Sequence, residues 1–194
     1  MIVLASRSES RRAMLDAAGV SYRVVPADLD ERAIERDLGR AEPCEIARAL
    51  AIAKARVVCA NASGSVVLGS DSLAVCGGRR FDKPHDRNAA AEHLRYFSGK
   101  SLELHSGAAL LRDGKEIWSG GAMATLQVRD LSDAFIADYL DAEWPAVSGC
   151  VGVFRIEGLG VQLFDRIDGD YFTILGMPLL DVLAALRDCG ELSA

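Results

Sequence analysis

The chain has 194 residues, of which 50% are hydrophobic and 26% are charged, and its formal net charge is −6. This length suits one globular domain with a sizeable core, and the acidic balance excludes a protein that binds nucleic acid through a broad basic face. The five cysteines and three histidines form no CxxC pair, zinc spacing or HExxH motif, which indicates reduced thiols in the cytoplasm.

Strand and helix patterns alternate in the first part of the chain, which favours an α/β fold. The apolar run at 1–5 predicts a buried strand and is too short for a signal peptide or a membrane span. Further elements are expected in this order: a helix over 10–18, a strand over 22–26, an acidic loop at 28–31 and a long helix from Pro43. The spacing along that last helix predicts an apolar face of Ile46, Leu50, Ala53 and Val57.

The second part of the chain begins with the apolar run "SVVLGSDSLAV" at 65–75, which predicts a central strand with a polar break in it. A loop and a helix are expected over 81–100, with Asp86 as the N-cap and Gly99 as the stop. Strands at 101–112 and 116–128 flank "RDGKE", whose Asp-Gly pair predicts a hairpin. The remaining expected elements are a helix over 133–141, a second hairpin around 168–169 and an amphipathic helix over 178–187.

The stretch "LASRSESRRAML" at 4–15 places three arginines at the start of the first helix. A helix N-terminus carries partial positive charge, so basic side chains there are disfavoured by a few tenths of a kcal/mol each. Either the arginines are solvated, or an anion binds among them.

Four other charged residues are candidates for chemistry, and each has an ordinary alternative. Asp71 lies near the end of an apolar strand, where a carboxylate is costly unless it is paired or binds a metal; otherwise it caps a turn. Lys83 precedes a proline, which holds its backbone extended, but Lys-Pro is also a common loop element. Lys54 either binds a ligand or extends from its helix to solvent. Glu31 ends the acidic loop "DLDE", and its ordinary alternative is a carboxylate in a solvated loop.

Several familiar enzyme motifs are missing from the sequence. It contains neither a GxGxxG fingerprint after the first strand nor a GxxxxGK[ST] phosphate loop, so a Rossmann oxidoreductase and a P-loop NTPase are disfavoured. The serines near the N-terminus lie outside any GxSxG context, which disfavours a serine hydrolase.

A set of short motifs in order resembles the Maf family of nucleotide pyrophosphatases: "LASRSESRR", "DLDE", "ALAIAKA", "GSDS", "DKP", "GVFRIEGLG" and "IDGDYFTILGMPL". The resemblance runs from residue 3 to about residue 187. It implies a single α/β domain over 1–194, with a mixed sheet and flanking helices like that of inosine triphosphate pyrophosphatases, in which two lobes could enclose the site in a cleft. It also implies a homodimer that hydrolyses a nucleoside triphosphate to the monophosphate and pyrophosphate with a divalent metal, Mg²⁺ or Mn²⁺.

The resemblance also implies roles for individual residues. The motif Ser-x-Ser-x-x-Arg places Ser6, Ser8 and Arg11 at the triphosphate. Matching positions give Glu31 as an acidic site residue, Lys54 and Lys83 as the two lysines, and Asp71 as the proton acceptor. These roles agree with the chemistry, because cations stabilise the departing pyrophosphate. Carboxylate oxygens suit Mg²⁺ or Mn²⁺, so Glu31 and Asp71 are the expected metal ligands. Asp71 either accepts the proton itself or orients the attacking water through the metal.

The resemblance further implies that three positions bear on the choice of base: Ser10, Ser72 and Glu157. Glu157 matches the branch that resembles 7-methyl-GTP pyrophosphatases, and a carboxylate can accept both the N1–H and the 2-amino group of guanine. Ser10 and Ser72 match neither that branch nor the dTTP/UTP branch, so a dTTP/UTP-preferring enzyme stays open as an alternative. Another alternative is a nucleotide-responsive regulator of cell division without catalysis, which would not need two carboxylates beside the cations.

Overall fold

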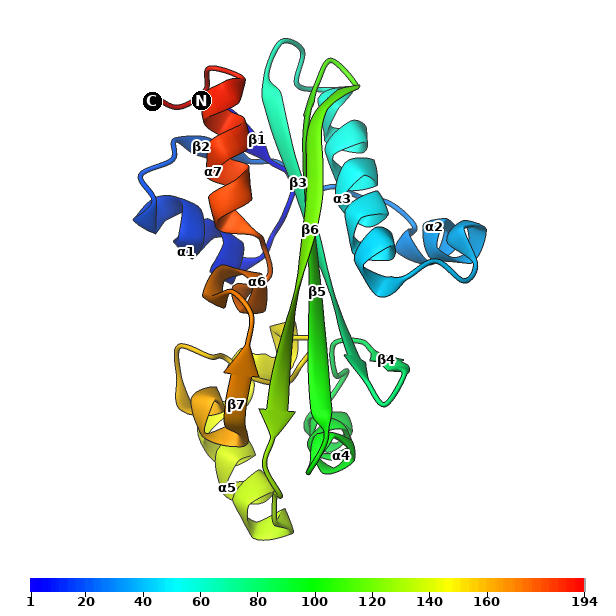
Figure 1. The fold of residues 1–194 in the computed structure, drawn as a ribbon, viewed down its shortest axis with the longest axis vertical. Coiled ribbons are helices and arrows are strands. Elements are labelled where there is room, and N and C mark those ends of the chain that lie inside the picture. Colours follow the sequence, from blue (N-terminus) through cyan, green and yellow to red (C-terminus); the bar gives the residue numbers. More distant parts are fainter. Residues whose placement is uncertain (194) are drawn as a thin grey trace. The chain divides into compact units, whose positions relative to one another are not determined.

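The structure, a computed structural model, describes residues 1–193 and has a seven-stranded mixed sheet with helices beside it (Figure 1). The strands are β1 (Ile2–Leu4), β2 (Tyr22–Val24), β3 (Val66–Cys76), β4 (Arg79–Phe81), β5 (Ser101–Arg112), β6 (Lys115–Val128) and β7 (Phe164–Asp168). Their order is β2-β1-β3-β5-β6-β7, with β4 paired to β3. Strand β1 runs parallel to β2 and β3, whereas β4 and β7 are antiparallel to their partners. The prediction of an α/β fold is confirmed.

The helices begin largely where the sequence predicts. They are α1 (Glu9–Ala17), α2 (Glu31–Leu38), α3 (Pro43–Cys59), α4 (Arg87–Phe97), α5 (Asp133–Glu143), α6 (Tyr171–Leu175) and α7 (Leu179–Asp188), with short 3₁₀ turns at Ala146–Gly149 and Leu159–Leu163. The Asp86 side chain caps α4 by accepting from the Ala89 N–H, as predicted. Within residues 1–193, no helix combines the length and the apolar character that crossing a membrane requires.

The chain divides into two compact units. Unit 1 comprises Met1–Ser72, His105–Ala122 and the chain from Tyr171 to the end of the described residues, and unit 2 comprises Leu73–Leu104 and Met123–Asp170. Strands β3, β5 and β6 contribute residues to both units.

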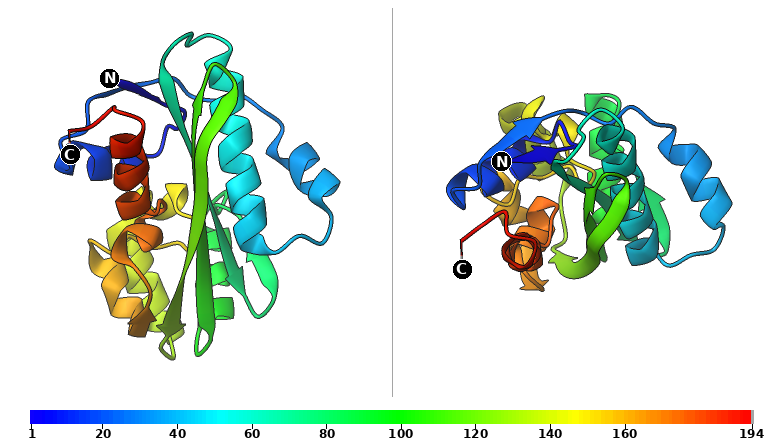
Figure 2. Two further views of the ribbon diagram at one scale, coloured as in Figure 1. Left: turned by 45° about the horizontal axis from the view of Figure 1, so that its top comes forward. Right: turned by 90° about the horizontal axis from the view of Figure 1, so that it is seen from above.

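Unit 1 has helices on both faces of its strands. Helices α1 and α7 cover one face and α3 covers the other, as the two views of Figure 2 show. The strands have the alternation expected of a sheet buried on both faces: Ile2 and Leu4 pack with α1 and α7, whereas Val3 packs with α3.

Two glycines allow α3 to approach the sheet closely. A Cβ atom at Gly69 in β3 would lie 2.0 Å from the Ala51 carbonyl oxygen, and one at Gly107 in β5 would lie 2.4 Å from the Ala47 carbonyl carbon. The backbone of α3 therefore packs directly on the backbones of β3 and β5.

The predicted apolar face of α3 is partly wrong. Leu50 is fully buried, but Val57 is 43% exposed. The buried face consists instead of Ala47, Leu50, Ala51, Ala55, Val58 and Cys59. Ala53 and Val57 line an apolar pocket with Ile34 of α2, because α2 packs beside α3 at this point. Small residues point to the sheet since the two glycines bring α3 so near to it.

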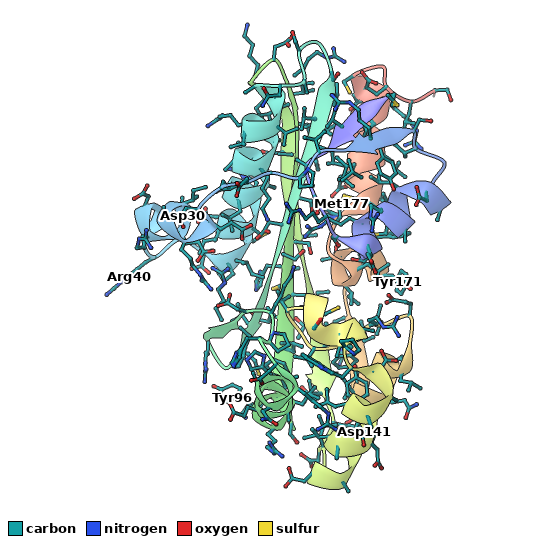
Figure 3. The ribbon with its side chains drawn as sticks, turned by 180° about the vertical axis from the view of Figure 1, so that it is seen from behind. Asp30, Arg40, Tyr96, Asp141, Tyr171 and Met177 are labelled. Carbon is teal, nitrogen blue, oxygen red and sulfur yellow. The ribbon has the colours of Figure 1, made fainter. Side chains whose placement is uncertain are left out.

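Two other expectations are corrected by the structure. The acidic loop at 28–31 ends in a helix, because the Asp30 side chain (labelled in Figure 3) accepts from the Ala33 N–H and starts α2 at Glu31. The second hairpin around 168–169 does not form, since β7 pairs with β6 and the chain continues into α6. A Cβ atom at Gly169 would lie 2.7 Å from the Ala124 Cα, so this glycine serves close packing against β6.

Unit 2 is held by contacts among α4, α5 and the end of β4. The rings of Phe81, His93 and Phe97 pack together, with Phe81 5.0 Å from His93 and 4.7 Å from Phe97 between centroids. The ring of Tyr96, labelled in Figure 3, lies against the same Phe81. An ion pair between Arg87 and Asp141 joins α4 to α5.

Candidate active site

The end of β1 and the middle of β3 place the candidate residues of unit 1: Asp71 is the central residue of β3, so the expectation that it lies near a strand end or caps a turn is wrong. Leu4 lies opposite Leu68 in the parallel pair, so the chain after β1 begins beside 69–72 of β3. Alternation along β3 sends Asp71 to the face covered by α3, where Lys54 lies, and Ser72 to the face of α1, where Arg11 lies. One short stretch of strand therefore reaches cations on both sides of the sheet.

Arg11 is buried at the first turns of α1, with 8% of its surface exposed. Its Nε donates to the Gly176 carbonyl oxygen at 2.9 Å, its Nη1 to Ser6 Oγ at 3.2 Å and its Nη2 to Ser72 Oγ at 2.9 Å. A guanidinium has five N–H donors, so these contacts leave two of them for a ligand.

No carboxylate contacts the Arg11 guanidinium among the described residues. All three acceptors are neutral oxygens, and within residues 1–193 Arg11 forms no salt bridge. Burial lowers the pKa of Arg11 from its ordinary value, while the charges of Asp71 and Glu31 act in the opposite direction. A buried cation held mainly by neutral groups favours the binding of an anion.

The serines before α1 organise its N-terminus. Ser8 is the N-cap, and its hydroxyl accepts from the Arg11 backbone N–H at 3.4 Å. Ser6 accepts from the backbone N–H of Ser8 at 3.2 Å, and Ser10 lies 2.9 Å from the Ser8 hydroxyl. Of the other arginines here, Arg12 lies 3.8 Å from Glu9 and Arg7 is exposed.

Lys54 joins the two candidate carboxylates. Its Nζ lies 2.8 Å from Glu31 Oε1 and 2.5 Å from Asp71 Oδ1, and only 13% of its side chain is exposed. Lys54 comes from the middle of α3, Glu31 from the first turn of α2 and Asp71 from β3. The alternative of a lysine that extends to solvent is therefore wrong.

A hydrogen-bond network behind Arg11 involves residues that the sequence analysis did not single out. The Gly176 carbonyl oxygen accepts from Ser70 Oγ at 3.1 Å as well as from Arg11, and Ser72 Oγ lies 3.1 Å from Ser106 Oγ. Ser106 in turn donates to the Thr173 carbonyl oxygen at 2.9 Å. The only sequence signal for Gly176 is its place in the motif "IDGDYFTILGMPL", because nothing near it in the chain reveals its partner 165 residues away.

The other two predicted site residues, Lys83 and Glu157, belong to unit 2, and both are exposed. Burial raises the pKa of the Cys150 thiol; the charge of Glu157 raises it further and that of Lys83 lowers it. Both charged side chains therefore lie near Cys150.

The proteins that this chain is similar to show its family. A family model described as Maf-like protein matches residues 1–189. The chain belongs to the Maf family. The relatives of this chain carry names that state an activity, and three of them illustrate this. One, from Nitrobacter hamburgensis and named nucleoside triphosphate pyrophosphatase, is 45% identical over 99% of this chain and 95% of its own length.

The other two relatives are named 7-methyl-GTP pyrophosphatase. The protein from Brucella suis is 45% identical over 96% of this chain and 94% of its own length. The protein from Rhizobium meliloti is 43% identical over 100% of this chain and 98% of its own length. Pyrophosphatases of this kind are hydrolases.

The site of this Maf chain has few donors for a metal. Within residues 1–193, no group of three or more His, Cys, Asp or Glu side chains is placed to hold one ion. Glu31 and Asp71 nevertheless direct one oxygen each at a single cation, the Lys54 ammonium. Mg²⁺ is commonly bound by one or two carboxylates together with substrate phosphates, so these residues fit it.

Proposed function

We propose that this Maf chain hydrolyses a nucleoside triphosphate to the monophosphate and pyrophosphate. The observation that carries the proposal is a buried Arg11 without a contacting carboxylate, together with the Glu31–Lys54–Asp71 cluster. Cations beside two carboxylates suit the attack of water on the α-phosphorus of a triphosphate. The names of the relatives from Nitrobacter, Brucella and Rhizobium support the same reaction class.

In this proposal, Arg11 and the N-terminus of α1 bind phosphate oxygens. The two remaining N–H donors of the guanidinium can bind phosphate in a bidentate manner. Ser6 and Ser8 hold the turn that leads into α1, where backbone N–H groups favour anions. Lys54 adds a second positive charge, and Lys83 is proposed to do the same.

We include a divalent cation, Mg²⁺ or Mn²⁺, held by Glu31 and Asp71. When bound, it would neutralise part of the phosphate charge and make a nearby water more acidic. Water attacks the α-phosphorus, the bond from the α-phosphorus to the oxygen bridging it to the β-phosphorus breaks, and pyrophosphate leaves with that oxygen. Asp71 accepts the proton of the water or orients it, and both roles require its carboxylate.

For the base, we propose a guanine-type nucleotide such as 7-methyl-GTP, selected by Glu157. A carboxylate can accept from N1–H and the 2-amino group together, whereas a pyrimidine edge offers one donor between two acceptors. Ser10 and Ser72 are proposed as further specificity positions, although both hydroxyls already bond within the protein. A homodimer and a cytoplasmic location stay predictions from the sequence.

The experiment is pyrophosphate release measured over a panel of GTP, 7-methyl-GTP, UTP and dTTP, with Mg²⁺, with Mn²⁺ and with EDTA. Asp71→Asn should lower kcat by about 100-fold or more while retaining nucleotide binding, because Asn has nearly the same shape but cannot act as a base. Asp37→Asn is the matched control, since Asp37 is exposed on α2 of the same unit.

Three results decide between the alternatives. Turnover that disappears with EDTA and returns with either metal supports the metal-dependent enzyme. Nucleotide binding without pyrophosphate release, for the unmutated chain on every nucleotide, would favour the non-catalytic regulator. Near-normal release by Asp71→Asn would contradict the role of Asp71.

A further inference from the structure

Glu143, at the end of α5, is a buried carboxylate that has no role in the proposed hydrolysis. Its surface is 4% exposed, and both of its oxygens are engaged. Oε2 accepts from Arg155 Nε at 2.9 Å and lies 2.9 Å from Arg155 Nη2, while Oε1 accepts from the Leu159 backbone N–H at 3.3 Å. Glu143 therefore contacts both ends of the segment 155–159, through the Arg155 side chain and the Leu159 backbone.

Helix α5, on which Figure 3 labels Asp141, also contacts the backbone just before this segment. The buried Tyr139 hydroxyl donates to the Val153 carbonyl oxygen at 3.0 Å. Val153 has φ of 58°, a left-handed conformation that a β-branched residue adopts only when its surroundings enforce it. Helix α5 thus fixes the backbone that leads into 155–159.

Glu157 lies at the tip of this segment. The Gly158 N–H donates to the Arg155 carbonyl oxygen at 3.1 Å, so Arg155 and Glu157 share one tight turn. Glu157 is exposed and, within residues 1–193, forms no salt bridge, although its charge acts on the Arg155 guanidinium. Arg155 is the cation beside Glu157 in this turn, and Glu143 holds its Nε and Nη2.

From these contacts we infer that Glu143 is a positioning residue for base selection: by holding Arg155, it keeps the Glu157 carboxylate available to the base. Without the Glu143 charge, the guanidinium is released and pairs with Glu157, whose oxygens can then no longer accept from guanine. The inference rests on the proposed function and on Glu157 as the residue that reads the base. Gly158 packs beside the Glu143–Arg155 ion pair, since a Cβ atom there would lie 3.3 Å from Glu143 Oε1 and 3.5 Å from Arg155 Nη2.

The test measures guanine preference, defined as kcat/KM for GTP divided by kcat/KM for UTP, from pyrophosphate release. This ratio is independent of the folded fraction of a sample, so it separates positioning from loss of stability. Glu143→Gln should lower the preference about tenfold, equivalent to about 1.4 kcal/mol. Glu157→Gln should lower it similarly, and the Glu143→Gln/Glu157→Gln pair should lower it no further than Glu157→Gln alone.

The deciding variant is Glu143→Gln/Arg155→Gln. It removes the competing cation, so guanine preference should return to within about threefold of the unmutated chain, an effect that a merely structural role of Glu143 does not produce. Asp133→Asn is the control on the same helix, since it breaks the Arg95–Asp133 ion pair, which involves neither Glu143 nor Arg155.

If Glu143→Gln does not fold, Arg155→Lys and Arg155→Gln make the same comparison with Glu143 intact. Lysine keeps a positive charge but cannot reproduce the two-nitrogen contact, so it should lower guanine preference, whereas glutamine should preserve it. An unchanged preference in Glu143→Gln, no recovery in the double variant, or equal effects of the two Arg155 variants would overturn the inference. So would an active unmutated chain without guanine preference, which would leave the pyrophosphatase activity standing. No pyrophosphate release from any nucleotide would overturn both proposals.

Discussion

Arg11 on α1 and Lys54 on α3 are two cations that contact neighbouring residues of β3, and their surroundings differ in kind. Lys54 contacts two carboxylates directly, so its charge is compensated in the chain itself. Arg11 contacts only hydroxyl and carbonyl oxygens and is more deeply buried. Burial of a cation without a contacting anion costs free energy, which a bound phosphate would offset. Of the three arginines at the start of α1, only Arg11 therefore needs a bound anion to offset its cost.

His93 in unit 2 gives a prediction at the scale of a single residue. Its ring packs against Phe81, its Nδ1 is buried without a hydrogen-bond partner among residues 1–193, and burial lowers its pKa from the ordinary value. The His93 imidazole therefore binds a proton near pH 6.5 in the unfolded chain, but only at lower pH in the folded chain. Folding stability should fall as the pH drops below about 6.5.

The urea midpoint at pH 7.5 and pH 5 measures this effect. His93→Phe should reduce the loss of stability at pH 5, because the ring cluster then contains no group that gains a charge. His85→Gln is the control, since the His85 side chain is 83% exposed. An equal pH dependence in His93→Phe and the unmutated chain would show that His93 is not responsible.

At the scale of elements, the packing of α3 on β3 places Lys54 against Asp71. Ala51, one turn before Lys54, contacts β3 at Gly69, where a side chain would collide with the Ala51 carbonyl oxygen at 2.0 Å. Gly69→Ala should push α3 away, cost about 1–3 kcal/mol of stability and weaken the Lys54–Asp71 contact, which lowers kcat as well.

Thermal unfolding and pyrophosphate release check the prediction for Gly69→Ala. The matched control is Gly149→Ala, because a Cβ atom at Gly149 meets nothing within 4 Å. A Gly69→Ala variant with unchanged stability and kcat would mean that α3 has room to adjust.

At the scale of the whole molecule, the net charge of −6 limits which polyanions can bind. Nucleic acid requires many phosphate contacts over a basic face, whereas one triphosphate requires a few cations at one point. Labelled duplex DNA should show no saturable anisotropy change with up to about 100 µM protein at 0.15 M salt, under conditions where nucleotides are turned over. Saturable binding in the micromolar range would contradict the prediction.

Features encoded by neighbouring residues could be predicted from the sequence. Asp86 and Ser132 accept from the N–H groups of Ala89 and Phe135 and start α4 and α5. The hairpin between β5 and β6 turns at Asp113 and Gly114, both with positive φ, as the Asp-Gly pair predicts. Each of these caps and turns depends only on residues a few positions apart, so the local sequence is enough to predict it.

Features that depend on distant segments could not be predicted. The inward face of α3 was misplaced because its position depends on Gly69 and Gly107, which come from other elements. The second hairpin was wrong because Gly169 packs against β6 instead of forming a tight turn.

The sequence by itself determined the α/β class, the main helix starts, the acidic character of the molecule and its membership of the Maf family. Only the tertiary structure decided what the charged residues contact: Arg11 meets Gly176, Lys54 meets both Glu31 and Asp71, and Glu143 holds Arg155. The physical reason is range. Helix caps and turns form between adjacent residues, whereas the compensation of a buried charge depends on which distant segments the fold brings within hydrogen-bond distance.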